Sequence, residues 1–376
     1  MIPSFFIKLT APYYIHLVPY NVRIIAFCAI SAVGMLLVSY SATDRTAQGI
    51  TIKMLGIVLA SLSSGGGELS FLGLVSFYGQ GSLSAWGSGT GGAGLIGAGM
   101  YALLTTALGL SVRGTLLASA FLPLIMLVAF FVLLPRSSLQ AASKRNAEYR
   151  SIAAEDEEET DAHETNGLLA QPNDRAHSPA LKHEPPLQRA LHSLVANLRR
   201  ARGLVVPYML PLFLVYVAEY TINQGVAPTL LFPLKESPFK HYRAFYPAYG
   251  TLYQLGVFVS RSSLPFLRIR TLYTPAILQV LNLALLTAHA INPFIPGVYF
   301  VFAIIFWEGL LGGLVYVSTF AAIREEVPEE DREFSLGATT VSDSGGICVA
   351  GFLGIAMESA LCGWQVQHGR DWCRRL

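Results

Sequence analysis

Four carboxylates lie inside long apolar stretches of the sequence, where an ionisable side chain is costly. They are Glu68, Glu219, Glu308 and Asp343. An acid at the middle of a bilayer costs on the order of 3 kcal/mol, which a polar cavity or a bonded partner normally offsets. Because burial favours the neutral form of a carboxyl group, such a side chain can carry a proton as well as bind a cation. The four acids therefore indicate a path for protons or for a small cationic molecule.

One of these acids shares its helical face with other polar side chains. Tyr216, Glu219, Tyr220 and Asn223 fall at i, i+3, i+4 and i+7, which is one face of a helix. Tyr253 and Gln254 mark a second polar side, and Gln279 and Asn282 supply a further polar edge. The residues expected to line the path are Glu68, Tyr216, Glu219, Tyr220, Asn223, Tyr253, Gln254, Glu308 and Asp343. For Glu308 and Asp343, a hydrogen bond that only packs helices together is the alternative interpretation.

The stretch from Ser61 to Met100 combines an apolar composition with many glycines. Small residues four positions apart, such as Gly87 and Gly91, let two helix backbones approach closely in a membrane. We expect this packing from the set Gly87, Gly89, Gly91, Gly92, Ala93 and Gly97. The same segment satisfies G-x-G-x-x-G, but it lacks the preceding strand and the later acidic residue that a dinucleotide site requires. We therefore reject a nucleotide-binding interpretation.

Composition assigns the chain to the membrane proteins. Of its 376 residues, 53% are apolar and 13% are charged, whereas soluble domains carry about 25% charged residues. A net charge of +2 gives no indication of a nucleic-acid partner. The four cysteines have no metal-binding spacing, and no H-E-x-x-H, G-x-S-x-G or P-loop motif occurs. We therefore expect no enzyme activity, no cofactor and no metal site.

Apolar runs of about 20 residues can cross a bilayer as helices. We expect nine such spans, at about 22–42, 52–78, 89–110, 114–134, 204–226, 244–261, 272–291, 297–322 and 333–357. A shorter run from Ile2 to Leu9 cannot span alone and looks like the end of a helix, which predicts a chain truncated at its N-terminus. The expected organisation is an N-terminal bundle at 1–135, a linker at 136–202, a C-terminal bundle at 203–360 and a short tail at 361–376.

The linker differs sharply from the bundles in composition. It holds ten basic and ten acidic residues, and its acidic run and its prolines are typical of disorder. Its last part, from Leu187 to Leu198, has the pattern of an interfacial amphipathic helix, with an ordinary soluble helix as the alternative. Basic residues at both ends of the linker predict that it is cytosolic.

Two further expectations depend on this orientation. Alternation of the spans puts Arg261 at the cytosolic end of its helix, where a charge that snorkels to the membrane boundary is the common role. Glu164, Leu168 and Leu169 in the linker have the spacing of an acidic dileucine sorting signal, which sorting adaptors read on cytosolic loops.

Six longer motifs carry a family resemblance. They are SSGGGELSFLGL, WGSGTGGAGLIGA, VYVAEYTINQG, YQLGVFVSRSSL, LQVLNLALL and WEGLLGGLVYVSTF. Together they resemble the battenin (Batten disease protein) family of lysosomal and vacuolar membrane proteins, from about Ile7 to Leu361 except in the linker. The resemblance implies a major-facilitator-like fold of two helical bundles, related to equilibrative nucleoside transporters. Members of the family also carry a first helix, a lumenal loop and most of a second helix that are absent here.

The resemblance also implies residence in the vacuolar or lysosomal membrane. The roles it implies are vacuolar pH homeostasis, transport of basic amino acids such as arginine, and export of glycerophosphodiesters. Our hypothesis is a secondary transporter that works by alternating access on such a small molecule, with protons as a further transported species. The alternative is a non-transporting membrane scaffold that affects vacuolar trafficking and pH through residues 155–169 of the linker.

Overall fold

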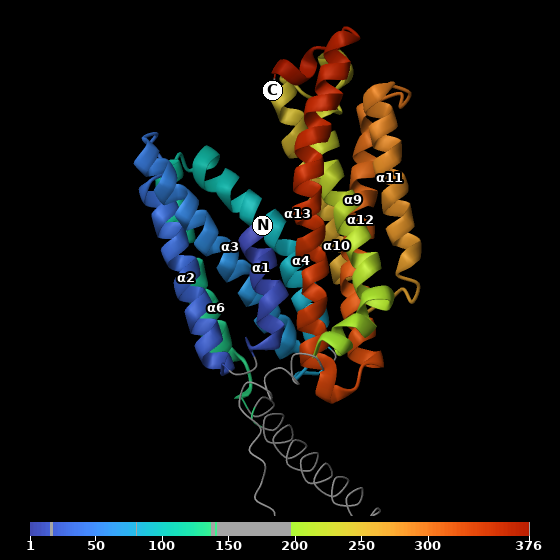
Figure 1. Ribbon diagram of the computed structural model, residues 1–376. Coiled ribbons are helices and arrows are strands. Elements are labelled where there is room, and N and C mark those ends of the chain that lie inside the picture. Colours follow the sequence, from blue (N-terminus) through green and yellow to red (C-terminus); the bar gives the residue numbers. More distant parts are fainter. Residues whose placement is uncertain (16–17, 80, 137–139, 141–196, 376) are drawn as a thin grey trace, which may run out of the picture.

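The computed structural model describes residues 1–15, 18–79, 81–136, 140 and 197–375. In this part of the chain every regular element is a helix (Figure 1). The expected all-α fold class is therefore confirmed. The dileucine motif at Glu164, Leu168 and Leu169 and most of the expected amphipathic segment lie outside the described residues.

The helices before the linker form a group that we call the N-terminal half. It contains α1 (Ile2–Thr10), α2 (Tyr20–Tyr40), α3 (Ala47–Val75), α4 (Gly81–Ala102), α5 (Val112–Ser119) and α6 (Leu122–Val128), and the π-helical turns η3 (Leu103–Ala107) and η4 (Ala129–Leu133) extend α4 and α6. Thr46 and Ser111 cap α3 and α5, because each side-chain oxygen accepts a hydrogen bond from a backbone N–H of the first turn. Pro123, in the first turn of α6, explains why α5 does not continue into it.

The helices after the linker form the C-terminal half. It contains α9 (Leu210–Thr221), α10 (Phe245–Ser262), α11 (Tyr273–Ile291), α12 (Val298–Glu326) and α13 (Glu329–Gln367), with π-helical turns η5 (Val205–Met209) and η6 (Ile222–Val226) on either side of α9. Pro211 lies in the first turn of α9, where its missing N–H costs nothing. Three acidic residues open α13, where negative charge is favourable, and the helix ends before Gly369, whose φ is +80°.

The nine expected spans all correspond to helices. Within the described chain, seven helical segments are long and apolar enough to cross a membrane: Tyr20–Tyr40, Ala47–Val75, Val112–Leu133, Asn197–Thr229, Tyr273–Ile291, Val298–Glu326 and Glu329–Gln367. The other two expected spans are α4 and α10, with 22 and 18 residues, which contain more glycine, serine and tyrosine. α13 reaches Gln367 rather than the expected 357, because its last turns contain no proline and the single glycine there, Gly363, weakens a helix without ending it.

The two halves meet along α1, α3 and α4 of the first and α10, α12 and α13 of the second. Figure 1 shows α1 and α4 between α2 and α6 on one side and the C-terminal half on the other. We call the side of the molecule where η4 ends and η5 begins the linker side, and the opposite side the far side. The C-terminal end of α13 lies on the far side (Figure 1).

Glycines set the closest helix approaches. A Cβ at Gly256 of α10 would lie 2.3 Å from the Phe306 carbonyl oxygen of α12, and one at Gly309 of α12 would lie 2.2 Å from the Tyr253 carbonyl oxygen of α10. Because real Cβ atoms do not approach other atoms closer than 3.0 Å, only glycine allows this backbone contact. It joins α10 and α12 tightly.

The small residues expected to pack α4 form two rows, and only one of them lies against another helix. Gly87 and Gly91 lie against α10, where added Cβ atoms would come within 3.1 Å and 3.2 Å of atoms of Arg261. A Cβ at Gly92 would make only ordinary contacts, with the Phe258 ring at 3.4 Å and the Ile96 side chain at 3.8 Å. Gly89, Ala93 and Gly97 are exposed, and a Cβ at Gly89 or Gly97 would meet no atom within 4 Å. The second row faces away from the neighbouring helices because it lies on a different side of the helix from Gly87 and Gly91.

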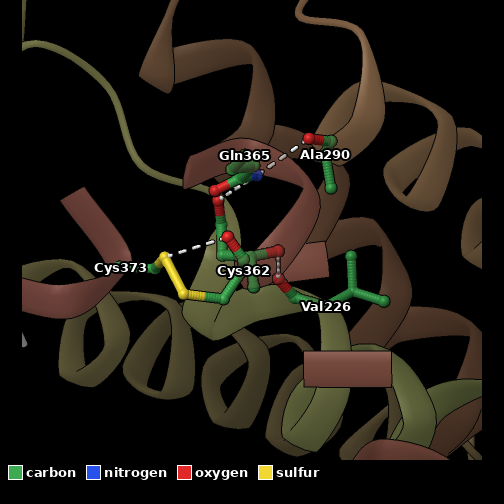
Figure 2. Close-up of a disulfide and its surroundings, with 6 residues drawn as sticks. Val226, Ala290, Cys362, Gln365 and Cys373 are labelled. Atoms are coloured by element: carbon green, nitrogen blue, oxygen red, sulfur yellow. Dashed lines mark hydrogen bonds between the residues drawn. A yellow bond between two sulfur atoms is a disulfide. The ribbon is translucent and has the colours of Figure 1, made fainter. Parts of the chain in front are cut away.

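A disulfide links two residues of the C-terminal segment on the far side. It joins Cys362, near the end of α13, to Cys373 in the 3-10 helix η10 (Trp372–Arg375) (Figure 2). Gln365, within the closed loop, donates to the carbonyl oxygens of Thr229 and Ala290 at 3.1 and 2.8 Å, which ties the tail to the far-side ends of two other segments. The scattered cysteine positions gave no indication of this bond.

Candidate functional site

Glu219 lies at the centre of the C-terminal half. Its side chain leaves α9 and is only 2% exposed. One carboxylate oxygen accepts a hydrogen bond from the Tyr253 hydroxyl of α10. The other, Oε2, has no hydrogen-bond partner and lies against Gly312 of α12, where a Cβ would come within 2.3 Å of it. A side chain at position 312 would therefore displace this carboxylate from its present place.

Glu308 is a second buried acid, on α12, and is 0% exposed. Its Oε1 accepts a hydrogen bond from the Asn223 amide at 3.2 Å, and its Oε2 has no partner. Asn223 belongs to the π-helical turn η6, which follows the α9 turn that carries Glu219. Neither Glu219 nor Glu308 is paired with a basic side chain of the described residues.

A buried lysine holds the other two acids. The Lys8 ammonium of α1 lies 2.7 Å from Glu68 Oε2 of α3 and 2.9 Å from Asp343 Oδ1 of α13. Lys8 is only 2% exposed. The Tyr316 hydroxyl of α12 donates to the other Glu68 oxygen at 2.8 Å. Sequence reasoning missed Lys8, although a lysine within the apolar run Ile2–Leu9 was a usable signal.

Arg261 does not snorkel to the membrane boundary as expected. Its guanidinium donates to the Thr90 hydroxyl of α4 and to the Tyr216 hydroxyl of α9, both at 3.0 Å. It also stacks over the Tyr316 ring, 3.9 Å from the centroid. No carboxylate of the described residues pairs with it, and its Nε is buried without a partner. The aromatic and hydroxyl groups of the facing helices hold the charge inside the molecule and explain the difference.

A cavity lies beside this charged layer, between α4 and the far-side ends of α9 and α10. Its volume is about 630 Å³, within the range of small-molecule sites. Four of the expected path residues line it, namely Tyr220, Asn223, Tyr253 and Gln254. Tyr253, which bonds Glu219, connects the cavity to the buried acids. Gln279 and Asn282 do not line it; they lie 3.5 Å from each other on α11.

The two halves are also bonded to each other on the linker side. Glu333 of α13 accepts from the Tyr20 hydroxyl at 2.6 Å and from Arg23, both on α2, at 3.4 Å. Arg324 of α12 donates to the Tyr78 carbonyl oxygen and to the Ser82 hydroxyl, at the α3–α4 turn. These contacts join the halves on the side opposite the cavity.

The fold and the site together define a membrane protein with several spanning helices. It has two helical groups, buried charges from both groups in the layer where they meet, and a cavity of substrate size beside that layer. The family description "CLN3 protein" matches residues 1–364, and the chain belongs to this family. The expected family is therefore confirmed.

The chain is also similar to curated relatives from fungi. It is 60% identical to "Protein btn1" of Aspergillus fumigatus, over 100% of this chain and 82% of the relative. It is 46% identical to "Protein BTN1" of Yarrowia lipolytica, over 99% of this chain and 87% of the relative. Among solved structures, it is similar to the major facilitator superfamily transporter FucP in the outward conformation, with a TM-score of 0.48, 16% identity, and coverage of 99% of this chain and 86% of FucP.

Proposed function

We propose that the protein is a secondary transporter that works by alternating access between its two halves. The observation that carries the proposal is the buried layer of charges at their contact, with a cavity on the far side and hydrogen bonds between the halves on the linker side. In alternating access, such a cavity takes up its substrate on one side and then opens on the other. The path for substrate or protons comprises Glu68, Tyr216, Glu219, Tyr220, Asn223, Tyr253, Gln254, Glu308 and Asp343. Of these, Glu68 and Asp343, which Lys8 holds, would carry protons rather than contact the substrate.

Two classes of small molecule suit the charges in this layer. A basic amino acid such as arginine suits Glu219 and Glu308, because each has one carboxylate oxygen without a partner. A glycerophosphodiester suits Arg261, because a guanidinium without a carboxylate partner binds phosphate strongly. The proposed transport is therefore of basic amino acids or of glycerophosphodiesters, together with protons that contribute to vacuolar pH homeostasis.

The proposed location is the vacuolar or lysosomal membrane, with the linker in the cytosol and the far side in the lumen. Basic residues at both ends of the linker support this orientation. The Cys362–Cys373 disulfide supports it independently, because disulfides persist in oxidising compartments and are rare in the cytosol. Sorting adaptors would then bind the motif at Glu164, Leu168 and Leu169.

The test is uptake by vacuolar membrane vesicles that contain this chain, against vesicles that lack it. Labelled arginine and labelled glycerophosphocholine are offered at lumenal pH 5 and pH 7. Glu219→Gln keeps the shape of the side chain and removes its charge, and Glu330→Gln, at an exposed acid on the linker side, is the matched control. We expect transport of one substrate that Glu219→Gln abolishes and Glu330→Gln preserves.

Absence of transport of both substrates would refute the transporter proposal. The alternative, a non-transporting scaffold, would then be favoured. In that case, deletion of residues 155–169 would change vacuolar pH and trafficking, while Glu219→Gln would change neither.

A further inference from the structure

Lys8 occupies a special position among the buried charges, because it pairs with one acid from each half. Lys8 and Glu68 both belong to the N-terminal half, on α1 and α3, whereas Asp343 belongs to the C-terminal half, on α13. When one half moves against the other, the Lys8–Glu68 pair can move as a unit. The Lys8–Asp343 pair must break.

Among its directly bonded groups the cluster has one more negative charge than positive, because Arg261, the next cation, stacks on Tyr316 and bonds neither carboxylate. Two carboxylates share a single ammonium, and the remaining donors, the Tyr316 hydroxyl and the Ser344 N–H, are neutral. An uncompensated charge is expensive in a membrane interior, whereas a proton removes it. The cluster therefore has a place for one proton.

The hydrogen bonds indicate which carboxylate takes this proton. Both oxygens of Glu68 accept a hydrogen bond, Oε2 from Lys8 and Oε1 from Tyr316, which favours the ionised form. In Asp343 the donors Lys8 and Ser344 both point to Oδ1. Its Oδ2 receives no hydrogen bond from the described residues and is the oxygen that can be protonated.

The other buried groups do not have this combination of properties. Glu219 and Glu308 belong to α9 and α12 of the same half, so a proton on either leaves the contact between the halves unchanged. Arg261 does bond across the halves, to Thr90, but a guanidinium stays charged at every physiological pH. The charged and titratable groups that interact with Asp343 from the packed helices are Lys8 on α1, Glu68 on α3, Tyr216 and Tyr220 on α9, and Tyr316 on α12. Arg261 on α10 lies beyond them, bonded to Tyr216 and stacked on Tyr316.

We propose that Asp343 is the proton-binding site that couples proton movement to the change of access, with Lys8 as the positioning residue that responds to it. This inference rests on the proposed transport function. Ionised Asp343 holds Lys8 and so keeps the two halves together where α1 contacts α13. A proton that enters from the cavity side binds Oδ2, Lys8 stays with Glu68 alone, and the halves are free to move.

The test measures two modes of transport, which distinguish the coupling of substrate movement to protons from substrate movement itself. In the first, reconstituted vesicles accumulate labelled glycerophosphocholine or arginine under an imposed pH gradient. In the second, they exchange labelled for unlabelled substrate without a gradient. For Asp343→Asn we expect at least a tenfold loss of gradient-driven accumulation, and a rate of exchange that persists and no longer depends on pH. For Lys8→Met we expect the same pattern, and for Lys8→Arg a return of the pH dependence.

The double variant Lys8→Met with Asp343→Asn covers a failure of folding in the single variants, because it removes both charges of the pair together. We expect it to exchange substrate without pH dependence. Glu330→Gln, at an exposed acid of the same helix, is the control and keeps both modes.

Retention of the wild-type pH dependence by Asp343→Asn would overturn the inference. Loss of exchange in the double variant would also overturn it, because Asp343 would then be required for transport itself. Absence of both modes in the unsubstituted protein would instead refute the transporter proposal.

Discussion

Replacing Gly309 by alanine tests how much the close contact of α10 and α12 stabilises the C-terminal half. The new Cβ would lie 2.2 Å from the Tyr253 carbonyl oxygen and 3.0 Å from the Val257 nitrogen. Ordinary contacts begin at 3.4 Å. The two helices must therefore separate by about 1 Å, which opens gaps along a close-packed interface.

The expected loss in the free energy of unfolding is about 3 kcal/mol, the upper end of the range for overpacked cores. The upper end applies because both crowding atoms belong to the backbone and cannot rotate away. Gly97→Ala is the control, since a Cβ there meets no atom within 4 Å. We expect it to leave stability unchanged or slightly higher, because alanine favours the helix more than glycine does.

The measurement is reversible unfolding of the purified protein in mixed micelles, as denaturing detergent is titrated and tryptophan fluorescence is followed. A Gly309→Ala protein as stable as the Gly97→Ala control would refute the reasoning. In that case the backbone contact between α10 and α12 would be adjustable rather than required.

Three further predictions use other parts of the molecule. Glu333→Gln weakens the bonds between the halves on the linker side, so a cysteine placed in the α3–α4 turn should react several-fold faster with a membrane-impermeant maleimide. The pKa of Asp44 is lowered because its carboxylate accepts a hydrogen bond from the Thr46 N–H. The stability that the ionised carboxylate contributes to the folded protein is therefore present at neutral pH and is lost as the pH falls through the lowered pKa. Asp44→Ala should therefore lower the thermal unfolding midpoint equally at pH 7 and pH 5, and have no effect well below about pH 4. Cys362→Ser should cost about 3 kcal/mol of stability and expose the tail to added protease, while the unsubstituted tail resists cleavage until a reductant is added.

The sequence was sufficient to predict the helices and one polar face. Long apolar runs have no stable alternative to helices in lipid, so hydropathy located them. The spacing of Tyr216, Glu219, Tyr220 and Asn223 was informative because residues three and four apart share a helical face whatever the tertiary structure. These inferences depend on local geometry alone.

The partners of those residues depend on how helices far apart in the chain are rotated and shifted. Lys8 is 335 positions from Asp343, and no local pattern relates them. The glycine rows of α4 show the same limit, because Gly87 with Gly91 and Gly89 with Gly97 are equally small, and only the position of α10 decides which row packs. The contacts of Arg261 with α4, α9 and α12 could not be predicted, because they depend on the groups that surround it.

Gly256 and Gly309 make α10 and α12 a single mechanical element. The two backbones are in such close contact that a tilt of one helix must be accompanied by the same tilt of the other. Arg261 on α10 and Tyr316 on α12 therefore stay stacked on each other when the two halves move in the proposed alternating access. In the proposed alternating access, the bond that changes is the one from Arg261 to Thr90 of α4, because Tyr216 of α9 belongs to the same half as Arg261. In that proposed movement the Arg261 charge would be carried by α10 and α12 as one rigid unit. Sliding would be confined to the contact with α4, where Gly87 and Gly91 have no side chain to obstruct it.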